Sequence, residues 1–577
     1  MRKGAITIKP VEKLIKVARG RCKADVVFKN VAVFNVFTGG FSTGDVAVVD
    51  GYIAGIGDYS GVEEIDLTGK YLTPGFIDSH VHIESAMVSP EQFASAIVPV
   101  GTTTIIADPH EIANVLGADG LGYILEATAE LPLNTYIMLP SCVPATELEH
   151  SGARLRAEEL AGFIQHPRVL GLGEMMDYPA VLAGNENVLK KIQLAVGKRI
   201  DGHAPGLTGK DLTAYIVAGI NSDHECVAPQ EAIERLSQGM HVMIREGSAV
   251  KNLRQLLPAV TAHTLPQCMF ATDDRHPEDL IELGHINHMV KLAVAAGMDV
   301  AWVLKMATIN AAKYFGLSDL GAIAPGYRAD MLVFENLETW QPVLVYKDGA
   351  LVAENRKALF TPTAVDNAMV KNSVGLGEIC PEKLQIPATS SSARVIGLIP
   401  EQLVTTLLEL PVPVVNGNFI ADPERDIIKL AVWERHHCTG QVGVGLLQGL
   451  GLRSGAIAST VAHDSHNLVV AGTNDEDMLL AVRELARVQG GLVIINQNKV
   501  LGRLPLPIAG LMTNKDVTKV REELLRLQII ARDLGIKEGY DPFMTLAFLS
   551  LPVIPAAKLT DAGLVDVTQF KLISVSL

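Results

Sequence analysis

The 577-residue sequence predicts an α/β protein whose central part is a (β/α)8 barrel, with a small β-sandwich built from both flanks of the barrel and an additional C-terminal α/β domain. Three observations predict this fold. Residues 73–317 alternate short apolar strands with helical stretches, β-rich hairpin sequences stand on both sides of them, and a further α/β sequence follows from 396. A chain of this length exceeds what one hydrophobic core organises, so several domains are expected.

The barrel prediction depends on the number and spacing of the strands. Eight βα units over residues 73–317 match the usual size of a closed parallel barrel, in which functional side chains collect at the carboxyl ends of the strands. The strand candidates are 74–80, 102–107, 134–139, 169–174, 199–203, 219–224, 240–245 and 268–273.

Two separated β-rich segments are predicted to form the sandwich. Residues 1–72 contain turn sequences at Thr38-Gly39-Gly40 and Asp50-Gly51, and residues 318–360 contain one at Lys347-Asp348-Gly349. Asp-Gly and Gly-Gly pairs between apolar runs are typical of hairpins. Because a small meander alone is marginally stable, we expect the two segments to cover each other.

The rest of the chain is assigned to a linker and a third unit. Residues 361–395 are expected to be a linker, and 396–577 a C-terminal α/β domain. In that domain Asn474 is predicted to cap a helix that ends at Val488, and a second helix is expected over 514–534. At the other end of the chain, residues 8–20 are predicted to form a short helix.

Composition limits the partners of the protein. The formal net charge is −15, and an acidic surface is repelled by nucleic-acid backbones and anionic membranes, so a small molecule is the expected partner. The six cysteines show no paired spacing, which favours a reducing cytoplasm. The N-terminus lacks the apolar core of a secretion signal, and no apolar run is long enough to span a membrane.

The first predicted barrel strand carries the strongest chemical signal, in the sequence LTPGFIDSHVHIES. Alternate side chains of a strand point to one face, so His80 and His82 project together. Two neighbouring imidazoles at a strand end, after a Pro-Gly turn, form half of a metal site. Either histidine alone would more often be a buried structural residue, so the interpretation depends on the other strands.

Those strands supply the remaining ligand types, two more histidines and two carboxylates. Four imidazoles and two carboxylates exceed what one tetrahedral ion takes. They suit two divalent ions bridged by a carboxylate and a water, an arrangement that makes hydroxide available near neutral pH. The predicted metal ligands are His80, His82, Glu174, His203, His224 and Asp273.

The order of these ligands along the chain resembles the amidohydrolase superfamily, and with it a metal-dependent hydrolase barrel. Many of its members bridge their metals with a carboxylated lysine, whereas this sequence offers Glu174. That glutamate, together with ADPHEIANV, SDHE and ATDDRHPEDL, is similar to the adenine deaminase family. AIASTVAHDSHNLVVAGTN resembles the C-terminal domain that sets this family apart from other amidohydrolases.

The resemblance implies hydrolytic deamination of adenine to hypoxanthine and ammonia, as part of purine salvage or catabolism. It implies two divalent ions per chain, Mn²⁺ or Fe²⁺. We expect Mn²⁺, although the ligand types also suit Zn²⁺. Asp273 is the expected group that takes the hydroxide proton and passes it to the leaving ammonia, and Glu174 is the second candidate for proton transfer, at N1 of the ring. A homo-oligomer is also implied.

Further polar residues near the strand ends are candidates for contacts to the purine, which needs donors and acceptors at its edges more than charge. Asp108 and His110 could equally cap their strand, and Arg245 could pair internally with Glu246. The candidates are Glu84, Asp108, His110, Glu111, Arg245, Asp274 and His276.

The C-terminal sequence AHDSHN allows three interpretations. His463, Asp464 and His466 could bind a third metal ion, form a wall of the barrel mouth, or belong to a polar loop that ties the C-terminal domain to the barrel.

Two other functions compete with the deaminase. A cyclic amide hydrolase of the dihydroorotase or hydantoinase type would share the barrel and the metals, but Glu174 in place of lysine and the large C-terminal domain argue against it. A non-catalytic scaffold of amidohydrolase type should lack one or more ligands, and none is missing here.

Overall fold

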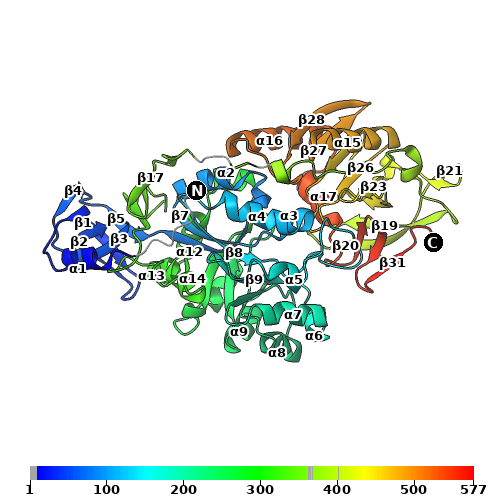
Figure 1. The fold of residues 1–577 in the computed structure, drawn as a ribbon. Coiled ribbons are helices and arrows are strands. Elements are labelled where there is room, and N and C mark those ends of the chain that lie inside the picture. The colour runs from blue at the N-terminus through cyan, green and yellow to red at the C-terminus, as the bar shows by residue number, and fades with distance from the viewer. Residues whose placement is uncertain (1–8, 362–364, 367, 401) are drawn as a thin grey trace.

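The computed structural model describes residues 9–361, 365–366, 368–400 and 402–577. The barrel occupies the middle of the molecule, with the N-terminal β region on one side and the C-terminal domain on the other (Figure 1). The helix predicted over 8–20 is α1, Val11–Ala18, and residue 8 lies outside the described residues.

None of the described helices combines the length and apolar character needed to cross a membrane. All six cysteines are described, and each is a free thiol.

All eight predicted barrel strands are present. Their sequences are buried on both faces, as parallel strands covered by helices are. The strands are β6 (Phe76–His82), β7 (Thr102–Ala107), β8 (Asn134–Leu139), β9 (Val169–Met175), β10 (Arg199–Gly202), β11 (Ser222–Asp223), β12 (His241–Arg245) and an eighth strand in two pieces, β13 (Cys268–Ala271) and β14 (Asp273–Asp274).

The sheet closes into a barrel. The strand order is β10-β9-β8-β7-β6-β14 in one hydrogen-bonded group and β11-β12-β13 in the other. The eighth strand joins the two groups, because β14 pairs with β6 while β13 pairs with β12. At the opposite seam the backbone N–H of Asn221 donates to the carbonyl oxygen of Ile200 at 2.8 Å. All strands therefore present their carboxyl ends at one mouth.

Helices surround this barrel, as the βα pattern predicts. They are α2 (Pro90–Ile97), α3 (His110–Leu116), α4 (Ala118–Ala127), α5 (Ala157–Leu160), α6 (Tyr178–Leu182), α7 (Glu186–Leu194), α8 (Gly209–Val217), α9 (Pro229–Ser237), α10 (Leu253–Leu256), α11 (Pro277–Glu282), α12 (Ile286–Ala295), α13 (Val300–Met306) and α14 (Ile309–Tyr314).

The two flanking β segments meet in one nine-stranded sheet. Strand β5 lies at the junction, parallel to β1 and antiparallel to β15. The sheet brings Phe28 and Tyr346, from the two segments, to a ring-centroid distance of 4.7 Å, so both segments share one core. Its strands are β1 (Ala24–Asn35), β2 (Gly40–Val49), β3 (Tyr52–Gly57), β4 (Gly61–Asp66), β5 (Tyr71–Pro74), β15 (Met331–Phe334), β16 (Leu344–Lys347), β17 (Ala350–Glu354) and β18 (Lys357–Ala358).

The C-terminal domain is built on an eight-stranded sheet of order β20-β19-β24-β23-β26-β25-β27-β28. These strands are β19 (Ser392–Leu398), β20 (Thr405–Pro411), β23 (Ile427–Trp433), β24 (Val442–Gln448), β25 (Ala456–Ser459), β26 (Leu468–Gly472), β27 (Gly491–Asn496) and β28 (Lys499–Pro505). Short strands form two further sheets: β21 (Val414–Val415) with β22 (Asn418–Phe419), and β29 (Ala557–Thr560), β30 (Gly563–Asp566) and β31 (Lys571–Ile573).

Three helices complete this domain: α15 (Asp475–Val488), α16 (Val517–Asp533) and α17 (Pro542–Leu549). Helix α15 begins as predicted, because the side chain of Asn474 accepts the backbone N–H of Asp477 at 2.8 Å. Helix α16 lies inside the predicted range 514–534 and is capped by Asp516.

The predicted linker packs against the C-terminal domain. Its last residues already belong to the sheet, since β19 begins at Ser392. Upstream, the backbone N–H of Gly375 donates to the carbonyl oxygen of Arg435 at 2.8 Å, and Leu384 is fully buried. Residues 362–364 and 367 of this segment lie outside the described residues.

The C-terminal domain covers the mouth of the barrel. The chain just after β6 meets it directly: Ser89 N donates to Thr513 O at 2.9 Å, and Thr513 N donates to Met87 O at 3.1 Å. Arg521 of α16 forms an ion pair with Glu282 of α11. Functional side chains at the strand ends therefore face this domain rather than bulk solvent.

Candidate metal centre

His80 and His82 lie side by side at the end of β6, as predicted. Both side chains are buried, and their Nε2 atoms are 3.1 Å apart. The Nδ1 atom of His82 is 2.8 Å from the carbonyl oxygen of Asp108, which can only accept a hydrogen bond. The proton of this imidazole therefore sits on Nδ1, and the lone pair of Nε2 is left for a metal.

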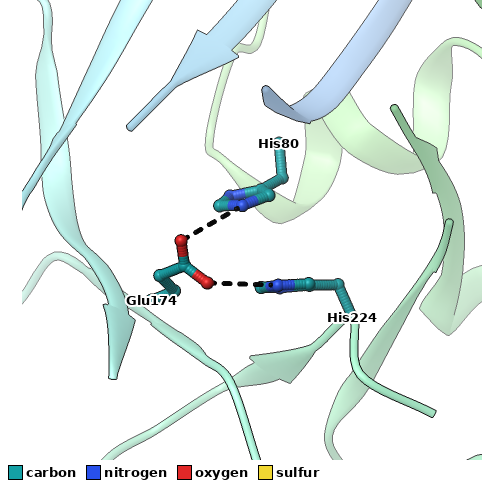
Figure 2. Close-up of side chains that lie close together, drawn as sticks. All are labelled: His80, Glu174 and His224. Carbon is teal, nitrogen blue, oxygen red and sulfur yellow. Dashed lines mark ion pairs between the residues drawn. The ribbon is translucent and has the colours of Figure 1, made fainter. Parts of the chain in front are cut away.

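Glu174, at the end of β9, lies in the middle of the four histidines. Its Oε1 is 3.8 Å from His80 Nε2 and 3.3 Å from His82 Nε2. Its Oε2 is 2.7 Å from His203 Nδ1 and 3.2 Å from His224 Nε2. Figure 2 shows the carboxylate between His80 and His224. Each oxygen thus serves one pair of imidazoles, which is the geometry of a bridging ligand.

Asp273, on β14, completes the predicted set. Its Oδ1 is 3.1 Å from His82 Nε2, and the residue has a φ of 58°. This left-handed conformation is sparsely populated but tolerated by aspartate, and such residues cluster at functional sites. Asp273 is the first residue of β14, directly after the break in the eighth strand at Thr272.

Arg245 holds Asp273 in place. Its Nη1 donates to Asp273 Oδ2 at 2.7 Å and also forms an ion pair with Glu225. The internal pair with Glu246 that the sequence suggested does not form, because the Glu246 carboxylate instead accepts the backbone N–H of Leu253 at 3.2 Å. The arginine therefore fixes the positions of the Asp273 and Glu225 carboxylates.

The residues present fit a metal centre. His224 is buried, yet neither of its ring nitrogens makes a hydrogen bond to any residue that the structure describes. Buried polar atoms without partners are rare in folded proteins. A bound metal ion would give this buried imidazole the partner that the protein does not supply. Donor atoms of His80, Glu174 and His224, and those of His80, His82 and Asp273, lie within 4.8 Å of one another. Nitrogen and carboxylate donors at this spacing suit divalent ions.

The protonation states of His80 and Glu174 suit metal ligands, which must be neutral imidazoles or ionised carboxylates. Burial, with the neighbouring His224, lowers the pKa of His80 to about 4. Burial alone would raise the pKa of Glu174, but the neighbouring imidazoles of His203, His224 and His82 hold it well below the usual range.

Two residues that the metal set did not include join the centre. Glu225 Oε1 is 3.5 Å from His224 Nε2 and 3.6 Å from His203 Nδ1. Its only sequence signal was its position next to His224. His110, predicted to face the purine, has its Nδ1 3.3 Å from Glu174 Oε1, so it borders the ligand cluster.

Asp108 lies behind the centre and positions Glu174. Its Oδ2 accepts the backbone N–H of Glu174 at 3.0 Å. The close approach depends on Gly173, because a Cβ at this position would lie 1.8 Å from that oxygen. The structure thus gives Asp108, a predicted purine contact, a hydrogen bond to the strand that carries the bridge.

The replacement Gly173→Ala is expected to displace Asp108 and with it Glu174. Forcing a methyl group into packed surroundings costs about 1–3 kcal/mol. We expect the alanine variant to have a lower melting temperature and lower metal content, measured by calorimetry and elemental analysis. Gly162→Ala is the control, because its added Cβ meets no atom within 4 Å. Equal metal content in the two variants would contradict this role of Gly173.

Three other predicted purine contacts stay at the mouth. Glu84 is buried, and its Oε1 accepts the backbone N–H of Ile112 at 3.2 Å, whereas its Oε2 makes no hydrogen bond among the described residues. Asp274 and His276 line a small cavity together with Met87 and His463. These side chains offer acceptors and donors next to the metal ligands.

The C-terminal loop with His463, Asp464 and His466 reaches the barrel. His466 Nε2 pairs with the carboxylate of Glu111, and His463 Nδ1 is 2.8 Å from Glu111 Oε1. The buried Arg435 donates to the carbonyl oxygen of His466 and fixes the loop from behind. Glu111, predicted to face the purine, is thus engaged by the C-terminal domain.

The fold and these donor atoms define a metal-dependent hydrolase of the amidohydrolase class, and residues 71–370 match the amidohydrolase family. Residues 402–571 match the adenine deaminase C-terminal domain. The chain is 64% identical over 570 residues to adenine deaminase 2 of Carboxydothermus hydrogenoformans, which covers 99% of this chain and 100% of the relative. It is 48% identical over 564 residues to adenine deaminase of Dehalococcoides mccartyi strain CBDB1, covering 98% and 99% of the two chains. The chain belongs to the adenine deaminase family.

Solved structures resemble parts of the chain. A beta-aspartyl dipeptidase of Fervidobacterium islandicum AW-1 superposes with a TM-score of 0.45 at 17% identity, covering 59% of this chain and 99% of that one. Atrazine chlorohydrolase of Arthrobacter aurescens TC1 gives a TM-score of 0.45 at 16% identity, covering 60% and 99%.

Proposed function

We propose that the chain hydrolyses adenine to hypoxanthine and ammonia at the cluster formed by His80, His82, Glu174, His203, His224 and Asp273. The observation that carries this proposal is the position of Glu174, whose two oxygens each face one pair of histidines. Two divalent ions would be held there, and Mn²⁺ is the proposed metal. When bound, such ions supply a nucleophile derived from water at neutral pH.

Asp273 is proposed to carry the proton from the attacking water to the departing amine. A carboxylate can do this only if it is ionised before the reaction and touches the nucleophile. Burial alone would raise the pKa of Asp273, but Arg245 and then the two imidazoles of β6 hold it well below its usual range. The arginine binds Oδ2, so Oδ1 is left toward the ligand cluster.

Glu174 is assigned the bridging role alone. Its Oε1 lies between imidazoles of β6 and the Nδ1 of His110, and its Oε2 faces His203 and His224. Neither oxygen is free to approach N1 of a purine ring. The second role foreseen for Glu174, proton transfer at N1, is therefore not part of the proposal.

Recognition of the base is proposed for the polar groups that remain at the mouth. The free Oε2 of Glu84 is a buried acceptor that needs a donor, and an amino or ring N–H of adenine offers one. Asp274 and His276 lie at the neighbouring cavity. A ligand that leaves such buried groups unpaired loses binding energy, which is how a polar site rejects the wrong base.

Adenine turnover by the purified full-length protein tests the function. We expect ammonia release and the adenine-to-hypoxanthine absorbance change after metal removal and reloading with Mn²⁺, and neither with adenosine. The rates of adenine turnover in parallel samples reloaded with Fe²⁺ or Zn²⁺ show which metal gives the highest activity. Hydrolysis of dihydroorotate or hydantoin without adenine turnover would favour the cyclic amide hydrolase instead. The predicted homo-oligomer is measured in the same samples by light scattering, and the cytoplasmic location by cell fractionation.

A further inference from the structure

Beside the cluster around Glu174, four other buried side chains converge on a second point. Glu111 Oε1 is 2.8 Å from His463 Nδ1 and 3.3 Å from His110 Nε2. Asp464 Oδ1 is 3.8 Å from His463 Nδ1 and 4.0 Å from His110 Nε2. Two of these side chains follow β7 of the barrel, and the other two come from the C-terminal loop, so the point lies between the two domains.

Imidazoles face both carboxylates at this point, yet each carboxylate keeps one oxygen that makes no hydrogen bond among the described residues. Glu111 and Asp464 are only 2% and 4% exposed. Glu111 Oε1 and Asp464 Oδ2 make no hydrogen bond within the described part of the chain. Burying two ionised carboxylates together is costly, and neither the neutral imidazoles of a metal site nor a neutral purine brings a positive charge. A cation at the point where the donor atoms converge would supply it.

His466 is excluded as a ligand by its hydrogen bonds, although its sequence position suggested one. The backbone N–H of Ala462 donates to His466 Nδ1 at 3.0 Å, so this nitrogen carries the lone pair. The proton of the neutral ring is then on Nε2, which donates to Glu111 Oε2. This pair orients the carboxylate and directs its other oxygen, Oε1, to the convergence point, as outer partners of metal ligands do.

We propose that His110, Glu111, His463 and Asp464 bind a third divalent cation, of the class of Zn²⁺ or Mn²⁺. In a tetrahedral site with metal–donor distances of about 2.1 Å, donor atoms lie about 3.4 Å apart. The four measured separations scatter around this value, from 2.8 to 4.0 Å. All four positions are taken by protein groups, which is typical of structural rather than catalytic sites. The ion therefore joins the C-terminal domain to the barrel mouth.

The first test is a count of ions in the wild-type, full-length protein. Crystals of protein loaded with Zn²⁺ or with Mn²⁺ are expected to show three anomalous-scattering peaks per chain, one of them among these four side chains. Elemental analysis of the same protein should give three ions per chain. Two ions per chain, with only water at the convergence point, would overturn the proposal.

Variants give a second test that does not depend on activity. Asp464→Asn is expected to bind two ions per chain and to lose part of the rise in melting temperature that Zn²⁺ gives the wild type. Asp561→Asn is the matched control, because Asp561 is a buried carboxylate of the same domain that accepts the backbone N–H of His150 at 3.0 Å and lies outside the cluster. It should keep three ions. Three ions in Asp464→Asn would refute the ligand set, and if that variant fails to fold, the wild-type anomalous map decides.

Discussion

Replacement of Glu174 by glutamine is expected to abolish adenine turnover, with a fall in kcat/KM of about 10³-fold or more. Metal ions contribute several kcal/mol of transition-state stabilisation, and each 1.36 kcal/mol is tenfold in rate. Glutamine keeps the shape of the side chain but offers one oxygen and no charge, whereas both oxygens of Glu174 face histidine nitrogens. We therefore expect the variant to retain fewer than two ions at this cluster.

The measurement combines steady-state kinetics on adenine with elemental analysis of the same protein after Mn²⁺ loading. Glu130→Gln is the matched control, because Glu130 is exposed on the surface after helix α4. It should leave both rate and ion content unchanged. A Glu174→Gln protein that turns over adenine within tenfold of the wild type would exclude the bridging role.

Replacement of Asp273 by asparagine is expected to lower kcat by about 10²–10⁴-fold, the usual range for loss of a general acid–base group. Asparagine tolerates the φ of 58° and keeps an oxygen toward His82, so the local backbone and part of the ion binding should survive. In Asp273→Asn we therefore expect kcat to fall much more than the ion content. In Glu174→Gln we expect both to fall together.

The pH dependence of kcat checks the assignment. If Asp273 must be ionised to accept the proton, the wild type loses activity as pH falls and this carboxylate is protonated. The residual activity of Asp273→Asn should lack that acidic limb. An unchanged kcat in a variant with full ion content would show that another group moves the proton, and Glu225, held by the same arginine, would be tested next.

Sequence pattern predicted the order of the fold well, because βα alternation is a local property. Local patterns do not predict how much of a segment forms ladder pairs. The strand predicted over 219–224 pairs only at Ser222–Asp223, as β11. Asn221 adds the backbone hydrogen bond that closes the barrel seam. The N-terminal and returning β segments were expected to cover each other. The two segments do share one core, and their strands also join edge to edge at β5, a pairing that depends on register between residues more than 250 positions apart.

The six candidate ligands lie together because each stands at the end of a strand, where a barrel collects side chains. The partners of Arg245 were not predicted, since Glu225 and Asp273 come from different strand ends and only the closed barrel brings them together. Asp108 was predicted as a purine contact, and one of its oxygens accepts a hydrogen bond from the backbone of Glu174. A carboxylate has the same appearance in a sequence whether it faces a ligand or the neighbouring strand.

The sequence by itself determined that this chain carries an amidohydrolase barrel, with six candidate metal ligands in order, and that it has the C-terminal domain of adenine deaminases. It could do so because strand periodicity and strand-end chemistry are encoded within a few neighbouring residues. Only the tertiary structure decided that His463 and Asp464 meet His110 and Glu111, more than 350 residues earlier in the chain. The packing of two domains sets that contact, and no local pattern in either segment records it.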